Sequence, residues 1–136
     1  MKTSEVVNIQ KSLDKFVDGL RLLDYKKISE IFFEKGLSCA SVKGNIQYVY
    51  RDHWKEMAKQ AKAKGEDFES STAHYAIKSL NIVGNAASVI IDLTFGTGDK
   101  ITEKYIDFYH MLKVQDNWCI VNKIFPTNIQ RGRIED

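Results

Sequence analysis

Residues 101–125, ITEKYIDFYHMLKVQDNWCIVNKIF, carry the clearest structural signal in the chain. Residues 101–114 and 118–125 are rich in β-branched and aromatic side chains, which is typical of strands. Between them stands Asp116-Asn117, a pair that accepts the positive φ of a tight turn. The segment therefore predicts a hairpin of two long antiparallel strands.

Two similar segments precede this hairpin. Residues 72–83 and 86–95 also have the composition of strands, and turn residues stand at Gly84-Asn85 and at Gly96-Thr97-Gly98. Consecutive hairpins of this kind predict an antiparallel meander of four strands.

The N-terminal half has the period of helices. Apolar residues recur at steps of three and four over residues 6–23, and helical patterns also cover residues 25–33 and 52–64. A short hairpin, residues 37–42 and 46–50, is predicted between the second and third helices. Helices gathered before a meander predict an α+β fold.

The length and composition fit one globular domain. The chain has 136 residues, of which 43% are hydrophobic and 28% charged. We expect a single domain over residues 1–136 with its core at about residues 6–126. Proline cannot donate to a strand ladder, so Pro126 ends the last strand and residues 127–136 are expected to form a loose tail.

Several classes of protein are excluded. The net charge of +2 is far below that of a dedicated nucleic-acid binder. No apolar run approaches the length that spans a membrane. Residues 1–10 do not resemble a signal peptide, so we expect a cytoplasmic protein. The two cysteines, Cys39 and Cys119, stand in no metal-ligand pattern, and neither a metal nor another cofactor is expected.

Three segments resemble a known superfamily. Residues 107–114, DFYHMLKV, residues 118–125, WCIVNKIF, and residues 16–20, FVDGL, are similar to the "putative lumazine-binding" branch of the nuclear transport factor 2-like superfamily. Ketosteroid isomerase, scytalone dehydratase and polyketide cyclases belong to this superfamily. The resemblance implies a cone in which three N-terminal helices pack on a curved mixed or antiparallel sheet of about six strands. It also implies a homodimer.

Hairpin register assigns the strand residues to two faces, because side chains alternate between the faces. Turns at Gly84-Asn85, Thr97-Gly98 and Asp116-Asn117 give an inner face that is the more apolar one. Its polar exceptions are His74, Lys78, Lys104, His110 and Lys123. The outer face then carries Tyr105, Tyr109, Met111, Trp118 and Ile120, and a surface this apolar predicts a homodimer through the outer sheet face.

His110 is the first candidate for catalysis, as a general acid or base on the inner face. The same register turns Asp107 outward. A β-bulge in the strand at residues 101–114 would exchange the two residues, so both are kept as catalytic candidates. Lys123, beside His110, needs an anionic partner or ligand if it is buried.

Aromatic residues are expected to form the walls of a cavity. The helices and the short hairpin supply Phe16, Phe33, Tyr50 and Trp54, and the sheet supplies Phe108 and Phe125. Packing in the core is the alternative role for these rings.

One absence separates the functions that the superfamily suggests. The general-base aspartate of ketosteroid isomerase would fall in the first short strand, where this chain has Leu37, Ser38 and Cys39. The leading hypothesis is therefore a pocket protein that binds a small apolar or aromatic molecule. The alternatives are a cofactor-free isomerase, cyclase or dehydratase, and a dimeric scaffold for protein interaction.

Overall fold

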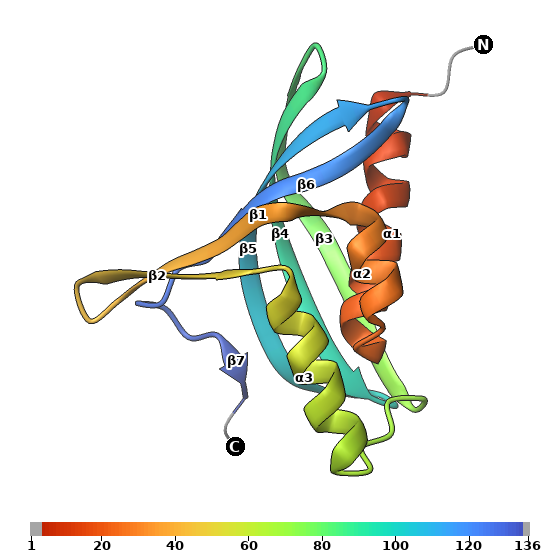
Figure 1. The fold of residues 1–136 in the computed structure, drawn as a ribbon, viewed down its shortest axis with the longest axis vertical. Helices are drawn as coiled ribbons and strands as arrows, with labels where there is room; N and C mark the ends of the chain where they lie inside the picture. The colour runs from red at the N-terminus through yellow and green to blue at the C-terminus, as the bar shows by residue number, and fades with distance from the viewer. Residues whose placement is uncertain (1–3, 135–136) are drawn as a thin grey trace.

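The computed structural model describes residues 4–134 and has helices on one side of a strongly curved sheet (Figure 1). The three helices are α1 (Glu5–Leu22), α2 (Tyr25–Ile31) and α3 (Asp52–Ala63). The α+β fold and its order of elements are confirmed. None of the helices in residues 4–134 has both the length and the apolar composition needed to cross a membrane.

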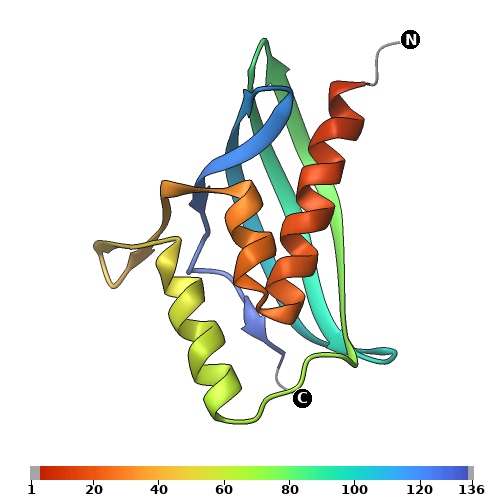
Figure 2. The same ribbon diagram turned by 45° about the vertical axis from the view of Figure 1, so that its right-hand side comes forward.

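Within residues 4–134, seven strands form one mixed sheet. They are β1 (Phe32–Val42), β2 (Asn45–Tyr50), β3 (Ser71–Val83), β4 (Ala86–Thr97), β5 (Lys100–Val114), β6 (Asn117–Ile124) and β7 (Gly132–Arg133). Their order is β2-β1-β6-β5-β4-β3, and β7 pairs with β5. The β1/β6 pair is parallel, while the other pairs are antiparallel. The helices lie on the concave side of the sheet (Figure 2).

Local signals explain where the first two helices begin and how they meet. Ser4 caps α1, and the Asp24 carboxylate caps α2 by accepting a hydrogen bond from the Lys27 amide at 3.3 Å. A Cβ on Gly19 would lie 3.0 Å from the Ile28 side chain. The glycine is therefore what lets α2 approach α1 so closely.

The core lies between the helices and the concave face of the sheet. Phe16 of α1 is fully buried, and its ring packs edge-on against Trp54 of α3 at 5.8 Å and against Tyr109 of β5 at 5.7 Å. Trp118 and Ile120 of β6 close the same core from the sheet. Aromatic packing therefore joins α1, α3 and β5, which are distant in sequence.

Each long hairpin of the meander contains one extra residue. Lys78 interrupts the pairing of β3 with β4, Thr102 that of β5 with β4, and Val121 that of β6 with β5. An extra residue in one strand bends the sheet and reverses which side chains face the core beyond it. The three bulges therefore both curve the cone and set its inner surface.

The predicted register was wrong between two of these bulges. Between the bulge at Thr102 and the bulge at Val121, the odd-numbered residues of β5 face the core. Asp107 therefore turns inward and His110 outward. This is the exchange that a bulge in the strand was expected to cause. The residues predicted for the outer face were also misplaced. Their side chains point into the core or the cavity, and they are Tyr105, Tyr109, Met111, Trp118 and Ile120.

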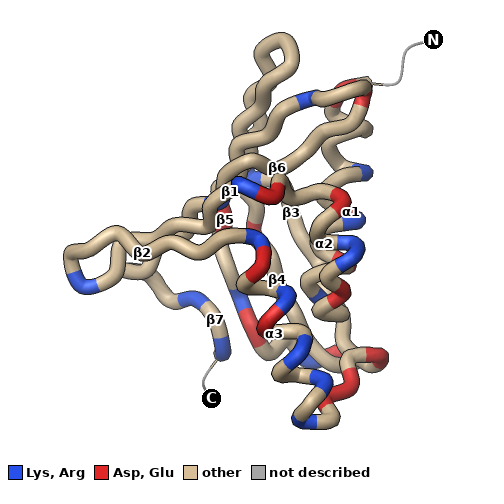
Figure 3. The backbone as a smooth tube through the Cα atoms, in the orientation of Figure 1, with Lys and Arg blue, Asp and Glu red and all other residues tan. Residues whose placement is uncertain are grey.

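The real outer face is nevertheless apolar. Ile90, Phe108, Ile124 and Cys39 are successive cross-strand partners on four neighbouring strands. Phe108 is 40% exposed and Ile124 is 44% exposed. Most charged residues of both signs instead lie on the helices and in the loops (Figure 3).

Residues 127–134 differ from the expected loose tail. They turn back along the sheet, and β7 pairs with β5 through Glu103–Arg133 and Lys104–Gly132. The Ile134 amide also donates to the Thr102 carbonyl at 2.8 Å. This segment places Arg131 against the inside of the cone.

Candidate ligand-binding cavity

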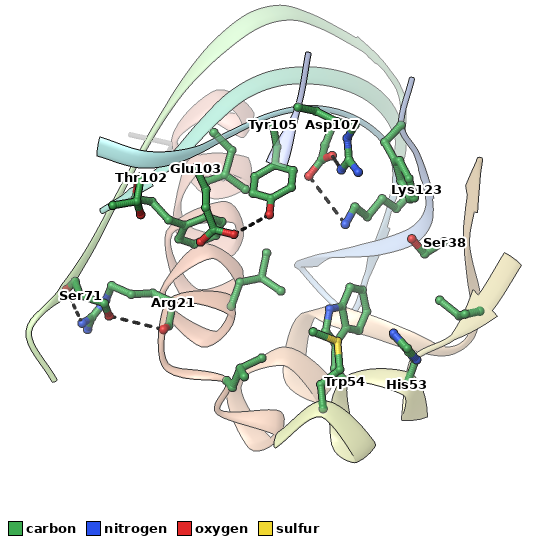
Figure 4. A pocket seen from close by; sticks show the side chains of 18 of the residues that line it. Arg21, Ser38, His53, Trp54, Ser71, Thr102, Glu103, Tyr105, Asp107 and Lys123 are labelled. Atoms are coloured by element: carbon green, nitrogen blue, oxygen red, sulfur yellow. Dashed lines mark hydrogen bonds and ion pairs between the residues drawn. The ribbon is translucent and has the colours of Figure 1, made fainter. Parts of the chain in front are cut away.

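A cavity of about 980 Å³ lies between α3 and the concave face of the sheet (Figure 4). The end of α1, the β1/β2 hairpin and the loop between α3 and β3 complete its walls. The cavity is large enough for a drug-sized molecule.

Four of the predicted site residues line this cavity, namely Asp107, Lys123, Trp54 and Phe125. The other five do not. Phe16 is buried in the core, whereas Phe33 and Tyr50 are about half exposed on β1 and β2. Phe108 and His110 stand on the outer face of β5.

Other predicted inner-face residues were also misplaced. His74, Lys78 and Lys104 are exposed. Lys78 is itself the bulge residue of β3, and its ammonium forms an ion pair with Asp92. Lys123 does face the inside of the cone, as predicted. The bulge at Thr102 reverses which residues face inward, and the bulge at Val121 reverses them again before Lys123.

Asp107 is the buried centre of a charged group. Its side chain is 2% exposed, and Oδ2 accepts a hydrogen bond from the Tyr109 hydroxyl at 3.0 Å. The Lys123 ammonium lies 3.8 Å from Oδ2, and the Arg131 guanidinium lies 3.9 Å from Oδ1. Burial raises the pKa of Tyr109 well above its usual range, and the neighbouring carboxylate adds to this, so the phenol remains a donor.

Lys123 is held among aromatic rings. Its Nζ lies 5.5 Å from the centre of the Trp54 ring and 5.4 Å from that of Phe125. Burial lowers the pKa of Lys123 below the usual lysine range, while Asp107 opposes this shift and Arg131 adds to it. The requirement that a buried lysine find an anionic partner is met by Asp107.

Arg131 was missed by sequence reasoning. Its guanidinium lies 4.1 Å from the centre of the Phe125 ring and 4.8 Å from that of Tyr105. The side chain is 22% exposed, and its Nε is buried with no partner among the described residues. The segment around it has no strand pattern, and only its pairing with β5 reveals its place.

A second polar group lies further along β5. Tyr105 donates a hydrogen bond from its hydroxyl to Glu103 Oε1 at 2.7 Å. Burial and the Glu103 carboxylate raise the pKa of Tyr105 to about 12. In Figure 4, Glu103 lies on one side of Tyr105 and the Asp107–Lys123 pair lies on the other. The sheet side of the cavity therefore carries charged or hydrogen-bonding groups at two places along β5.

Ser38 is a further residue that the sequence did not single out for the site. It pairs with Lys123 across the parallel β1/β6 ladder and lines the cavity, and it is 5% exposed. Its neighbours Leu37 and Cys39 point to the opposite face. Within residues 4–134, no three His, Cys, Asp or Glu side chains are placed to hold a metal ion.

A curved sheet that encloses a cavity under three helices is the architecture of the nuclear transport factor 2-like superfamily. The family described as "Putative lumazine-binding" matches residues 4–126, and the chain belongs to it.

Solved structures agree with this assignment. A nuclear transport factor 2-like protein of unknown function from Silicibacter pomeroyi is 23% identical, with a TM-score of 0.73 over 98% of this chain and 100% of that chain. A similar protein of unknown function from Shewanella baltica is 25% identical, with a TM-score of 0.68 over 95% and 100% of the two chains. A ketosteroid isomerase-like protein from Erwinia carotovora is 13% identical, with a TM-score of 0.63 over 95% and 100%. No functionally curated protein matches the chain.

Proposed function

We propose that this protein binds a small, largely apolar or aromatic molecule in the cavity between α3 and the sheet. The single observation that carries the proposal is a cavity of about 980 Å³ whose walls include several aromatic rings and aliphatic side chains. Concave sites of this size that combine aromatic and apolar walls with polar groups are typical of small organic ligands.

The ring positions support a planar ligand. Trp54 stands on α3, while Phe95, Tyr105 and Phe125 come from the sheet and the segment after it. Flat side chains on facing walls offer stacking area to a flat ligand. The family description names lumazine, a planar heteroaromatic compound, and lumazine belongs in any panel of test ligands.

The geometry gives less support to the enzyme alternative. The proposed acid or base, His110, lies outside the cavity on the outer face. Asp107 reaches the cavity, but its carboxylate is engaged by Tyr109, Lys123 and Arg131.

A neutral fluorescent dye, N-phenyl-1-naphthylamine, tests the proposal directly. We expect saturable binding of one dye per chain, seen as increased dye fluorescence in the apolar site. A Thr102→Trp substitution places a large ring in the cavity wall and should weaken dye binding at least about tenfold, because filled volume excludes the ligand.

The matched control is Thr94→Trp. Thr94 lies on the adjacent strand β4, on the face away from the cavity, and pairs with Lys104. This variant should bind the dye as the parent does. Absence of saturable binding, or equal binding by Thr102→Trp and the parent, would refute the proposed cavity function.

We also propose that two copies associate through the outer sheet face. The surface that supports this is the row of Ile90, Phe108, Ile124 and Cys39 on four adjacent strands. An exposed apolar row at the centre of a sheet is costly in water, and a second copy of the same face would cover it with two-fold symmetry.

A further inference from the structure

We propose that the ligand is an aromatic carboxylate whose carboxylate group binds between Lys123 and Arg131. This inference rests on the proposed binding function and adds the charge and orientation of the molecule. It places the anionic end at these two cations and the ring against Trp54, Phe125 and Tyr105.

The charges around Asp107 do not balance. One carboxylate faces two cations, Lys123 and Arg131, so this group carries an excess of one positive charge. All three side chains are largely buried, with exposed fractions of 2%, 13% and 22%. Uncompensated charge is costly away from water, and an anionic ligand would remove that cost.

The cations also have hydrogen-bonding capacity to spare. The distances of 3.8 and 3.9 Å to Asp107 exceed the length of a hydrogen bond. Arg131 Nε has no partner in the described part of the chain. An ammonium has three donors and a guanidinium has five, so both can bind a second carboxylate without leaving the first.

Aromatic faces surround the same two cations. Phe125 lies under both of them, Trp54 lies beside Lys123, and Tyr105 lies beside Arg131. A ligand whose carboxylate reaches the cations therefore brings an attached ring into contact with these side chains. The Glu103 carboxylate beyond Tyr105 disfavours the reverse orientation, because it would repel the anionic end.

The test compares two ligands of the same shape, 2-naphthoate and neutral 2-naphthamide, by isothermal titration calorimetry at pH 7.5. We expect the parent to bind naphthoate at least about tenfold more tightly than naphthamide, as charge-assisted hydrogen bonds require. Arg131→Gln should remove most of this difference by weakening naphthoate binding, with little change for naphthamide.

Arg133→Gln is the matched control. It removes the same charge two residues away, on an exposed side chain outside the cavity lining, and should leave both affinities unchanged. Arg131→Lys should recover part of the preference for naphthoate. Thermal unfolding followed by circular dichroism verifies that each variant is folded.

The outcomes separate this inference from the proposed function. If the neutral dye binds in the cavity while naphthoate and naphthamide bind equally, the cavity function stands and the anion site is refuted. Equal losses in Arg131→Gln and Arg133→Gln would refute it as well, since a long-range charge effect would then be responsible. If no dye, naphthoate or naphthamide binds, both proposals fail.

Discussion

Lys123 illustrates how burial and partners act on one side chain in opposite directions. Contact with Trp54 and Phe125 removes water from its ammonium, which lowers its pKa, while Asp107 stabilises the charged form. Burial is the larger effect. The charge of this lysine is therefore lost at a lower pH than the ordinary value of 10.5.

This shift predicts the pH dependence of naphthoate binding. The anion needs a protonated Lys123, and the carboxylate of the probe remains ionised throughout the alkaline range. Affinity should therefore begin to fall below pH 10.5 and then decrease by up to about tenfold per pH unit. Calorimetric titrations between pH 7 and 10.5 measure the profile.

Lys123→Arg is the control for that profile, because a guanidinium stays protonated over the whole range. Its naphthoate affinity should not fall with pH. A parent protein whose affinity is flat up to pH 10.5 would contradict both the lowered pKa and the role of Lys123.

Ser38 supports a second prediction. It faces the cavity at the strand where the superfamily resemblance would place the base of a ketosteroid isomerase, and Cys39 points away. General-base catalysis needs an ionisable group within about 3 Å of the proton removed, and a serine hydroxyl does not ionise near neutral pH. We expect no isomerisation of a β,γ-unsaturated ketosteroid above the buffer rate.

The ultraviolet absorbance of the conjugated product checks this prediction. Turnover that disappears in Asp107→Asn would show that Asp107 serves as the base. In that case the enzyme alternative would replace the binding function.

At the scale of elements, the sequence was sufficient for the three helices and for β1 to β6, but not for β7 or for the faces of the strands. Two turns lie one residue from their predicted positions, at Gly98-Asp99 and Gln115-Asp116. Moving a two-residue turn by one position shifts every cross-strand partner by two residues. Because side chains alternate between the faces with a period of two, each residue stays on its predicted face. The faces were reversed by the bulges instead.

The bulges explain which site residues could be predicted. His110 and Phe108 lie between the bulges at Thr102 and Val121 and were placed on the wrong face, whereas Lys123 and Phe125 lie beyond both and were placed correctly. The bulge residues themselves, a lysine, a threonine and a valine, give no compositional signal. Arg131 was missed for a different reason, because its position depends on a long-range pairing of β7 with β5.

Gly96 is the residue that accommodates the Thr102 bulge. A Cβ added there would lie 2.1 Å from the Lys100 carbonyl oxygen, which is backbone and cannot move freely. We expect Gly96→Ala to lower the free energy of unfolding by more than about 2 kcal/mol, through displacement of the bulge. Urea denaturation provides the measurement.

Gly98→Ala is the comparison for Gly96→Ala. Gly98 has a φ of +59° but open space around its Cβ position. Gly98→Ala should therefore lower the free energy of unfolding by about 1 kcal/mol. A smaller loss for Gly96→Ala than for Gly98→Ala would contradict the role given to the close contact.

At the scale of the whole molecule, the two faces of the sheet carry different features. The concave face carries the core and the cavity, while the convex face carries the apolar row proposed as a dimer surface. Arg131, Lys123 and Trp54 all come from one chain. Association and ligand binding should therefore be separable by mutation.

Phe108→Glu is the variant that separates them. Phe108 lies between Ile90 and Ile124 in the middle of the apolar row, and a buried unpaired carboxylate there would oppose association. The parent should sediment as a dimer at about 100 µM, well above the dissociation constants of stable dimers, and Phe108→Glu as a monomer that still binds the neutral dye. Val83→Glu, at the far end of β3 on a side chain that is 79% exposed, should remain dimeric. A parent protein that is monomeric at this concentration would rule out the dimer. Loss of dye binding in a folded Phe108→Glu monomer would show instead that the second copy helps to form the cavity.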